Sequence, residues 1–435
     1  RLIDAIENLG EVDNTLVIYI TGDNGTSPEG GMNGRYNEMT YFNGVDEKIE
    51  TVMKHLNEWG SPSTYPHMAA GWAVCFDSPF TWTKQIASNY GGTRQGLVIH
   101  WPKRIKAKGE LRKQWHHVID IAPTILEAVG LPQPRIVNGI GQRPMEGVGM
   151  LYSFDDPEAA DRHLVQYFEI IGNRGVYCDG WFAGTVHMDP WAKGPRHGLQ
   201  EDVWELYHVA EDFSMAHDLS AKYPEKLKEL QSLFLSEAVK YKVLPIDDRR
   251  EERFNPKLAG RPDLMGGRTS ITVYEGLGFL PENDFINTKN TSFEIVAEVE
   301  DKDGATNGVI ISQGGRFGGW SFYIRDDKPI YIYNFLGLES FAVSSHAALP
   351  KGKSTVKLDF AYDGKPELGG GGTATLYING ERVGSGRIDK THLAIWSADE
   401  TANIGIDRET PVSPDYTEQT SKFSGKIHKV TITLK

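Results

Sequence analysis

Apolar positions in the first part of the chain alternate between helical and strand-like spacing. Residues 2–9 carry apolar side chains at a helical period, and a continuous apolar run over 16–21 predicts a buried strand. A second short buried strand is expected over 95–101, and further helices are expected at 45–59 and 117–129. Strands that alternate with helices are typical of an α/β fold with a mainly parallel sheet.

The pattern changes twice further along the chain. Short strands at 164–171, 175–179, 181–186 and 204–207, followed by a helix at 223–240, predict a small α+β subdomain. Beyond it, period-2 strands separated by glycine-rich turns recur without helices, which indicates a β-sandwich. The expected organisation is therefore an α/β part at 1–155, an α+β subdomain at 156–250, a linker at 251–268 and a sandwich at 269–435. The charged linker could instead be a solvated arm that packs on the preceding domain.

Composition excludes some classes of partner. The 435 residues carry a net charge of -13, which argues against nucleic acid or an anionic membrane as the main partner, although a local pocket can still bind an anion. No stretch approaches the length of a transmembrane helix. The two cysteines, Cys75 and Cys178, have no metal-type spacing, and we expect both to be small buried apolar residues. The helical pattern is already under way at Arg1, so we expect a longer protein, and no signal peptide can be sought here.

The first strand ends in a candidate metal site. Asp23 and Asn24 follow the apolar run directly, where open α/β sheets place their ligands, and both side chains offer hard oxygen atoms. Oxygen ligands favour Ca²⁺ or Mg²⁺ over zinc. The alternative is an Asx turn that merely ends the strand. Lys84, in an irregular loop before a Gly-Gly turn, could reach an anionic group as a point charge, or it could be an ordinary surface lysine.

Further segments follow these residues in a characteristic order. They are Asp13 to Gly25, Pro79-Phe80 with Lys84, Gly91 to Arg94 with Trp101-Pro102, His117 to Thr124, Gly172 to Arg174, and Trp204 to Tyr207 with Asp212, Asp218 and Leu219. Together they resemble the sulfatase family of the alkaline-phosphatase-like superfamily, and bacterial arylsulfatases within it. The resemblance covers about residues 1–250. It implies the second half of an alkaline-phosphatase-like α/β core followed by the α+β subdomain. The pattern of strands and turns over 269–435 resembles that of concanavalin-like jelly rolls.

The resemblance also implies a chemistry. In sulfatases a formylglycine, made from a Cys or Ser, attacks sulfur as a gem-diol while a calcium ion holds the nucleophile and the sulfate oxygens. Asp23 and Asn24 would be the second pair of calcium ligands, with Mg²⁺ as an alternative ion. Lys84 would contact the sulfate and stabilise charge near the leaving oxygen. A dication and a lysine relieve the repulsion between an oxygen nucleophile and a sulfate monoanion.

The sequence departs from the family in one decisive respect. The formylglycine motif, Cys or Ser followed by x-Pro-x-Arg, is absent, and neither Cys75 nor Cys178 has this context. The family's first pair of metal ligands, its sulfate-binding Arg and its first Lys/His pair are also absent. We therefore expect the chain alone to be inactive on sulfate esters. The expected substrate of the whole enzyme is a sulfate ester, preferably an aryl sulfate, or a sulfated glycan.

Rival functions remain open at this point. One is a phosphoric or phosphonic monoester hydrolase of the same superfamily, and the other is a carbohydrate-binding or structural protein with an inert α/β part. The oligomeric state is open, and a periplasmic or secreted location is favoured. In the sandwich, aromatic residues could stack on sugar rings, with a role in the core as the favoured alternative; they are Trp320, Tyr331, Tyr333 and Trp396.

The sequence leaves two possible roles for each of several other polar residues. His116 and His117 are expected to pack or to cap a helix rather than to act in catalysis. Asn173 and Arg174 either line the cleft or bind backbone carbonyls, and a structural role is favoured. His67 belongs to an aromatic-rich loop that either shapes a substrate pocket or fills the core.

Overall fold

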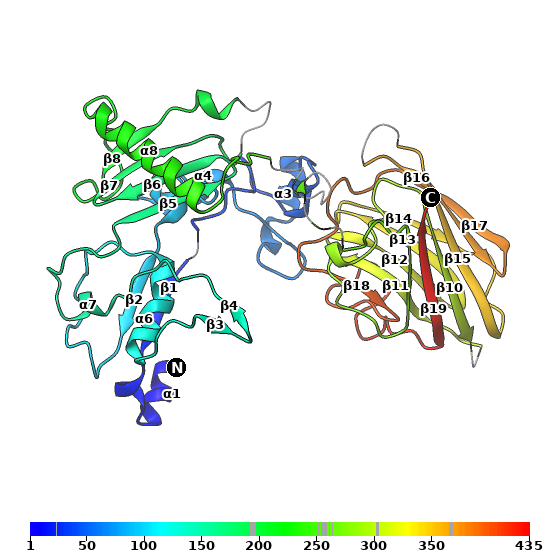
Figure 1. Ribbon diagram of the computed structural model, residues 1–435. Coiled ribbons are helices and arrows are strands. Elements are labelled where there is room, and N and C mark those ends of the chain that lie inside the picture. The colour runs from blue at the N-terminus through cyan, green and yellow to red at the C-terminus, as the bar shows by residue number, and fades with distance from the viewer. Residues whose placement is uncertain are drawn as a thin grey trace. The chain divides into compact units, whose positions relative to one another are not determined.

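The chain folds into two compact units. The computed structural model describes residues 1–22, 24–191, 197–249, 253, 259–260, 262, 264–301, 304–364 and 369–435. The first unit comprises Arg1–Met32 and Met68–Asp248, and the second comprises Asn33–His67 and Arg249–Lys435 (Figure 1). Within the described residues, no helix has both the length and the hydrophobicity needed to cross a bilayer.

The first unit begins with two short helical elements and a pair of strands. Helix α1 (Leu2–Asn8) and the 3-10 turn η1 (Val12–Asn14) lead into β1 (Val17–Thr21). Strand β1 pairs with β2 (Gly96–His100) in antiparallel fashion. All ladders between named strands of the described part are antiparallel, so the prediction of a mainly parallel sheet is wrong.

The chain between β1 and β2 explains this pairing. It does not return along the sheet as one crossover helix, as a parallel pair requires. Instead it leaves for the second unit, comes back through α4 (Ala70–Asp77) and α5 (Tyr90–Thr93), and enters β2 at the end where β1 exits. Thr21 therefore lies opposite Gly96, and the segment after β1 meets the segment before β2.

The two strands are more exposed than their composition predicts. Tyr19 of β1 is 62% exposed and Val98 of β2 is 61% exposed, so the expectation of buried strands is wrong for much of both. The adjacent apolar cluster, which centres on Met150, Leu151 and Phe154, includes Ile99 and Trp101 but covers only part of the pair.

Helices and a hairpin complete this part of the unit. The helix expected at 117–129 forms as η3 (Val118–Asp120) continued by α6 (Ile121–Ala128). The remaining elements are β3 (Ile136–Val137), β4 (Ile140–Gly141) and α7 (Leu151–Phe154).

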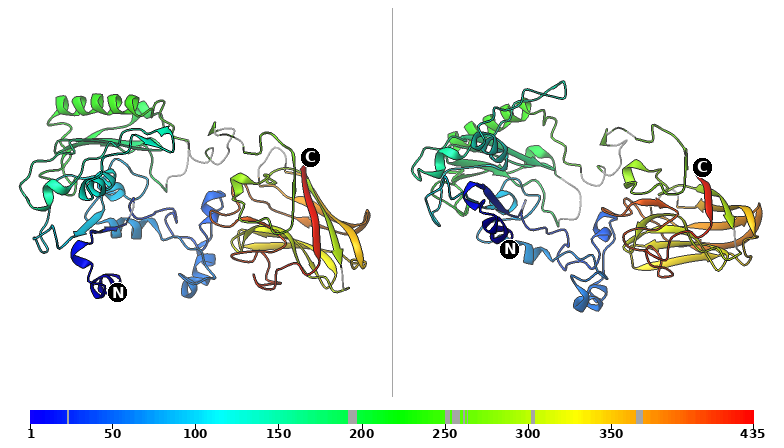
Figure 2. Two further views of the ribbon diagram at one scale, coloured as in Figure 1. Left: turned by 60° about the horizontal axis from the view of Figure 1, so that its bottom comes forward. Right: turned by 90° about the horizontal axis from the view of Figure 1, so that it is seen from below.

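A four-stranded antiparallel sheet forms the rest of the first unit. Its order is β5-β6-β7-β8, with β5 at Val165–Ile170, β6 at Asn173–Cys178, β7 at Trp181–Thr185 and β8 at Glu205–His208. Helix α8 (Pro224–Lys240) lies along one face of it (Figure 2). Pro224 occupies the first turn, where its missing N–H has no cost. Leu230, Phe234 and Ala238 of α8 pack on Val176, Ala183 and Leu206 of the sheet, and the predicted strands and helix of this region are confirmed.

The second unit contains two antiparallel sheets around a common apolar core. One is six-stranded in the order β17-β16-β15-β10-β19-β9, and the other is five-stranded in the order β14-β13-β12-β11-β18. The strands are β9 (Ser270–Val273), β10 (Phe293–Asp301), β11 (Gly308–Gly315), β12 (Gly318–Arg325), β13 (Lys328–Phe335), β14 (Glu339–Ser344), β15 (Gly352–Tyr362), β16 (Gly372–Ile378), β17 (Glu381–Ile388), β18 (Ala402–Ile404) and β19 (Lys426–Leu434). Their jelly-roll connectivity stays a prediction. The four aromatic residues proposed as sugar contacts are buried in this core, in agreement with the favoured alternative; they are Trp320, Tyr331, Tyr333 and Trp396.

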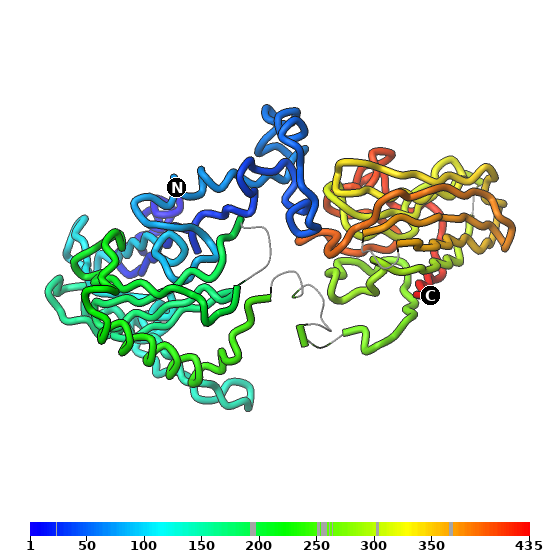
Figure 3. Tube along the Cα trace, turned by 90° about the horizontal axis from the view of Figure 1, so that it is seen from above, coloured from blue at the N-terminus to red at the C-terminus, as the bar shows by residue number. Residues whose placement is uncertain are grey.

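The segment Asn33–His67 packs with the second unit, although the sequence placed it in the α/β part (Figure 3). It carries α2 (Met39–Phe42), α3 (Ile49–Lys54) and η2 (Leu56–Glu58), so the helix expected at 45–59 is shorter and ends in a 3-10 turn. Asn37 donates its Nδ2 hydrogens to the carbonyls of Phe317 and Leu336, at 2.9 and 2.8 Å. These buried hydrogen bonds tie the segment to the second unit.

Candidate functional site

The turn after β1 is built on glycine. Gly22 and Gly25 have φ values of +87° and +86°, which side chains rarely adopt. A Cβ on Gly25 would lie 2.1 Å from the carbonyl oxygen of Gly91 and 2.8 Å from the backbone nitrogen of Lys84. The turn that carries Asn24 therefore touches the loop that carries Lys84, backbone against backbone.

Hydrogen bonds join the same two segments. The backbone N–H of Lys84 donates to the carbonyl of Thr26 at 3.2 Å. The carboxylate of Asp77, at the end of α4, accepts the Thr26 N–H at 3.0 Å and the Thr26 hydroxyl at 2.8 Å. The start and end of the long excursion between β1 and β2 are thus fixed to each other.

The predicted metal ligands are only partly described. Asp23 lies outside the described residues, so its position relative to Asn24 is untested. Asn24 is an exposed residue of the glycine turn. The structure brings its segment together with that of Lys84, although sixty positions separate the two in sequence.

The Lys84 side chain points toward a buried carboxylate. Its Nζ lies 3.4 Å from Oε2 of Glu29, and the lysine side chain is 32% exposed. Glu29 is buried, and it also accepts hydrogen bonds from the Ser27 hydroxyl and the Gln85 amide, both at 2.6 Å. Glu29 therefore orients an ammonium group that stays accessible from solvent.

The backbone around Lys84 is unusual. Trp82 and Gln85 both have positive φ, 67° and 77°, a conformation that costs about 1–3 kcal/mol for non-glycine residues and that clusters at functional sites. The Gly-Gly turn encloses this loop: a Cβ on Gly91 would lie 2.1 Å from the Trp82 carbonyl, and one on Gly92 would lie 2.2 Å from the Ile86 carbonyl. Only glycine lets the backbone approach so closely.

Asn173 and Arg174 support this loop from β6. Asn173 donates to the carbonyl of Gln85 at 2.8 Å. The Arg174 guanidinium donates to the carbonyls of Gly172 and Leu199, at 2.8 and 3.0 Å. Both residues bind backbone carbonyls, which agrees with the structural role that the sequence analysis favoured.

The His116-His117 pair belongs to a helix cap. The ring of His117 accepts the Ile119 N–H at 3.4 Å, and Asp120 Oδ2 accepts the His117 N–H at 2.9 Å. Burial, with His163 nearby, lowers the pKa of His117 to about 4. Burial alone would raise the pKa of Asp120, but the nearby His116 ring and hydrogen bonds from His163 and two backbone N–H groups hold it well below its usual range. The structure thus agrees with the expected capping role.

The structure also gives the positions of His67 and of the two cysteines. His67 is a residue of the second unit, with its Nε2 3.0 Å from Glu38, whereas Lys84 is a residue of the first unit. Cys75 is exposed and Cys178 is half-buried, so the expectation that both cysteines are buried is wrong. Cys75 is on α4, whose buried face is formed by Ala70 and Ala73.

Sequence reasoning missed three residues around Lys84. Glu29, Asp77 and Gln85 are isolated polar residues, and nothing in their spacing links them to Lys84. The one available signal was the position of Glu29 in a glycine-rich loop directly after the candidate ligands.

The donor chemistry at this site fits a hard dication only in part. Ca²⁺ binds about six to eight oxygen atoms. Asn24 can offer one amide oxygen, whereas Glu29 and Asp77 already accept several hydrogen bonds. Within the described residues, no group of three or more His, Cys, Asp or Glu side chains with metal spacing lies here. Asn24 would thus be one ligand among others supplied from elsewhere.

Comparisons with known proteins show what this chain is similar to. Residues 1–131 match the family model described as Sulfatase. The chain is 25% identical over 237 residues to an uncharacterized sulfatase of Schizosaccharomyces pombe, covering 54% of this chain and 40% of the relative. It is 24% identical over 274 residues to an N-acetylglucosamine-6-O-sulfatase of Bacteroides thetaiotaomicron, covering 62% and 37%.

A solved structure from Bacteroides thetaiotaomicron, from work on the metabolism of glycosaminoglycans, is 17% identical with a TM-score of 0.35, covering 54% of this chain and 41% of that one. The chain spans about two fifths of the length of the curated relatives it matches. The family match covers residues 1–131 of the chain, which include the Asn24 turn and the Lys84 loop.

Proposed function

We propose that the first unit contributes Asp23, Asn24 and Lys84 to the active site of a sulfate-ester hydrolase that uses Ca²⁺. The observation that carries the proposal is the backbone contact between the Asn24 turn and the Lys84 loop at Gly25. It supports a site in which an oxygen ligand and a partly exposed ammonium group face the same anion.

The residues of this chain would act by charge. A sulfate ester carries a fixed negative charge, and further charge develops on the leaving oxygen as the S–O bond breaks. The Lys84 ammonium, oriented by Glu29 at 3.4 Å, would bind a sulfate oxygen and stabilise that charge. When bound, Ca²⁺ would supply positive charge to the sulfate oxygens, with Asp23 and Asn24 among its ligands and Mg²⁺ as the alternative ion.

The nucleophile of the proposed reaction is not in this sequence. The family uses a formylglycine, and no Cys or Ser here is followed by x-Pro-x-Arg. We therefore expect no turnover by these 435 residues alone. A substrate of the aryl sulfate class is preferred from the resemblance to arylsulfatases, and a sulfated glycan is the alternative because one relative is named as an N-acetylglucosamine-6-O-sulfatase.

Calcium binding by the full chain tests the ligand assignment. Isothermal titration should show a weak site, because the family's first pair of metal ligands is absent from this chain. Its affinity should fall on the order of 10-fold or more in Asp23→Ala and in Asn24→Ala, because each removes an oxygen ligand. The chain offers a matched control in Asp13-Asn14, a second Asp-Asn pair that is exposed and precedes β1. Asp13→Ala and Asn14→Ala should leave the affinity unchanged.

Two results would contradict the proposal. Unchanged calcium affinity in both Asp23→Ala and Asn24→Ala would remove these residues from the metal site. Turnover of an aryl sulfate by the purified chain with calcium, above the rate without protein, would show that the nucleophile lies within this sequence.

A further inference from the structure

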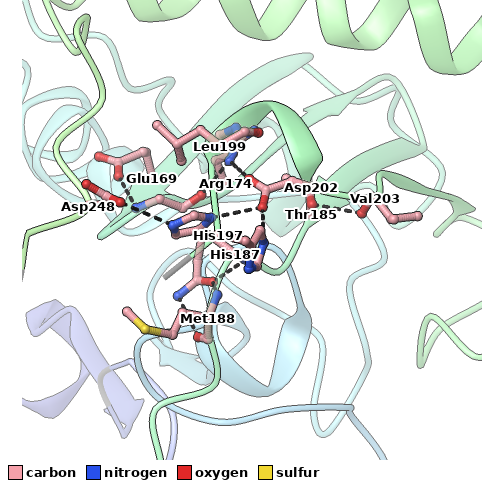
Figure 4. Close-up of polar contacts among 12 residues, drawn as sticks. Glu169, Arg174, Thr185, His187, Met188, His197, Leu199, Asp202, Val203 and Asp248 are labelled. Carbon is pink, nitrogen blue, oxygen red and sulfur yellow. Dashed lines mark hydrogen bonds and ion pairs between the residues drawn. The ribbon is translucent and has the colours of Figure 1, made fainter. Parts of the chain in front are cut away.

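We propose that His187, His197 and Asp202 form a zinc-binding site in the first unit, independent of the proposed calcium site. Their ligand atoms all lie within 4.8 Å of one another (Figure 4). His187 Nδ1 is 2.9 Å and His197 Nε2 is 2.7 Å from the same oxygen, Oδ1 of Asp202. Two imidazole nitrogens thus converge on one carboxylate oxygen.

The local fold brings these residues together from the two ends of one connection. His187 follows β7, which ends at Thr185, and the 3-10 turn η4 (Leu199–Glu201) brings Asp202 back toward the start of β8. Strands β7 and β8 are paired, and Thr185 donates its hydroxyl to the carbonyl of Val203 at 2.7 Å. The ligands on either side of the connection are therefore anchored to the same sheet.

The surroundings of the His187 ring point to a metal ligand. Its Nδ1 faces Asp202, and its Nε2 lies 3.4 Å from Oδ2 of Asp248. A neutral imidazole has one N–H and cannot donate to both carboxylates. With zinc on Nδ1, the proton would be on Nε2 and would face Asp248, the carboxylate–histidine–metal arrangement that metal-bound histidines usually adopt.

The other contacts fix the donors in place. A Cβ on Gly172 would lie 2.6 Å from Cδ2 of His187, so the ring packs directly on that glycine. The second oxygen of Asp202 accepts from Arg174 Nη1 at 2.5 Å, which leaves Oδ1 directed at the histidines. The donor set of two nitrogens and one carboxylate oxygen is that of many zinc sites and differs from the all-oxygen sets of calcium and magnesium.

Charge and geometry favour a dication here. Among the described side chains that contact the cluster, two carboxylates (Asp202 and Asp248) and one guanidinium (Arg174) provide a negative environment for Zn²⁺ when the histidines are neutral. Tetrahedral zinc with bonds of about 2.0–2.1 Å requires ligand atoms about 3.3 Å apart. The ligands must therefore separate by roughly 0.5 Å from their present contacts. The His197 side chain is 46% exposed, so it can move.

The site would brace the loop that carries Lys84. The backbone N–H of His187 donates to Asn173 Oδ1 at 2.8 Å, and Asn173 donates in turn to the carbonyl of Gln85. Trp191, in the same connection, stacks on Trp82 with ring centroids 5.9 Å apart. We therefore assign the zinc a structural role in positioning this loop and no part in the chemical step.

Zinc titration of the full chain tests the site. The protein would be purified without a polyhistidine tag, treated with a chelator, and titrated with Zn²⁺ against a chromophoric competitor. We expect one tight site per chain. His197→Ala should weaken it on the order of 100-fold by removing a ligand, and Asp248→Asn should weaken it about 10–100-fold by removing the partner of His187.

A matched control comes from the same unit. His217 is also next to a carboxylate, 3.6 Å from Asp212, but its side chain is 83% exposed and lies outside the cluster. His217→Ala should bind zinc as the unmodified chain does. In addition, Co²⁺ in place of Zn²⁺ should give the visible absorption of a tetrahedral N/O site.

The outcomes separate this proposal from the calcium site. His197→Ala should retain calcium affinity, and Asn24→Ala should retain zinc affinity. His197 is the preferred position for substitution because its exposed side chain can be removed without opening the core. The proposal is refuted if the chain binds no stoichiometric zinc, or if His197→Ala binds zinc as tightly as the unmodified chain.

Discussion

The glycine contact that encloses the Lys84 loop makes a sharp prediction about Gly91→Ala. A Cβ at this position would lie 2.1 Å from the carbonyl oxygen of Trp82 and 2.3 Å from that of Thr81. Cβ atoms in proteins essentially never approach other heavy atoms closer than 3.0 Å, so the Trp82 carbonyl would have to move by about 0.9 Å (3.0 minus 2.1). Both atoms are backbone, so no side-chain rotation can relieve the clash.

The expected loss of stability in Gly91→Ala follows from the backbone contacts that the new Cβ displaces. Overpacking of a tight contact costs about 1–3 kcal/mol. The Gly91 N–H donates to the Thr81 carbonyl at 3.0 Å, and loss of that hydrogen bond adds about 0.5–1.5 kcal/mol. We therefore expect a destabilisation of about 2–4 kcal/mol, a large part of the 5–15 kcal/mol that stabilises typical domains. Because Lys84 belongs to the displaced loop, its ammonium should also lose its position relative to Glu29.

Gly71→Ala is the matched control for this substitution. Gly71 is a residue of α4, and a Cβ there would meet no atom within 4 Å. Alanine is favoured over glycine in a helix by roughly 0.5–1 kcal/mol, so the same chemical change should stabilise the protein slightly. Gly91→Ala should lower the free energy of unfolding, whereas Gly71→Ala should raise it slightly.

Hydrogen exchange measured by mass spectrometry is the appropriate assay, since a protein with two units need not unfold in one step. In Gly91→Ala, peptides that cover 80–95 should exchange faster, while those of the second unit should be unchanged. Equal protection of these peptides in Gly91→Ala and Gly71→Ala would refute the close approach of Gly91 to the Thr81 and Trp82 carbonyls.

Two further predictions concern other parts of the molecule. The pKa of His117 is lowered to about 4 from its ordinary 6.5, so the unfolded chain binds a proton at this site before the folded chain does as the pH falls. The free energy of unfolding should therefore be at its full value above about pH 6.5. It should decline between about pH 6.5 and pH 4, by up to about 3 kcal/mol. His117→Asn, which keeps a cap acceptor, should flatten this dependence in thermal melts between pH 7.5 and 4, and an unchanged slope would contradict the assignment. Asn37→Ala leaves two carbonyls of the second unit without their donor. It should lower the free energy of unfolding of that unit by about 2–4 kcal/mol, as measured by chemical denaturation. Replacement of the exposed Asn14 by alanine should have no effect on it.

Local patterns in the sequence predicted elements better than their arrangement. Helix α8 could be predicted because Pro224 marks its start and its apolar residues repeat on one face, and the period-2 strands of the second unit could be predicted for the same kind of reason. The antiparallel pairing of β1 with β2 could not, because it depends on where the chain travels between them. The exposure of Tyr19 and Val98 could not be predicted either, since strand composition does not reveal how many layers cover a sheet.

The excursion of Asn33–His67 to the second unit shows the same limit. Its contacts are long-range, such as the hydrogen bonds from Asn37 to residues about 300 positions away, and a single sequence carries no sign of them. At the candidate site, the sequence indicated Asn24 and Lys84 through the type of residue and its local setting. It did not indicate Glu29, because an isolated glutamate in a loop has no periodic or compositional signal.

The role of Glu29 follows from comparing its ion pair with the rest of its contacts. A partly exposed lysine–carboxylate pair contributes only about 0–1 kcal/mol to stability, so the contact with Lys84 cannot by itself hold the loop. The loop is held instead by backbone contacts to Thr26 and Gly91 and by Asn173. Glu29 is buried and fixed by two short hydrogen bonds, from Ser27 and Gln85, and so offers Lys84 a charge at a constant position. In the proposed site the scaffold therefore sets where the ammonium lies, and Glu29 sets where it points.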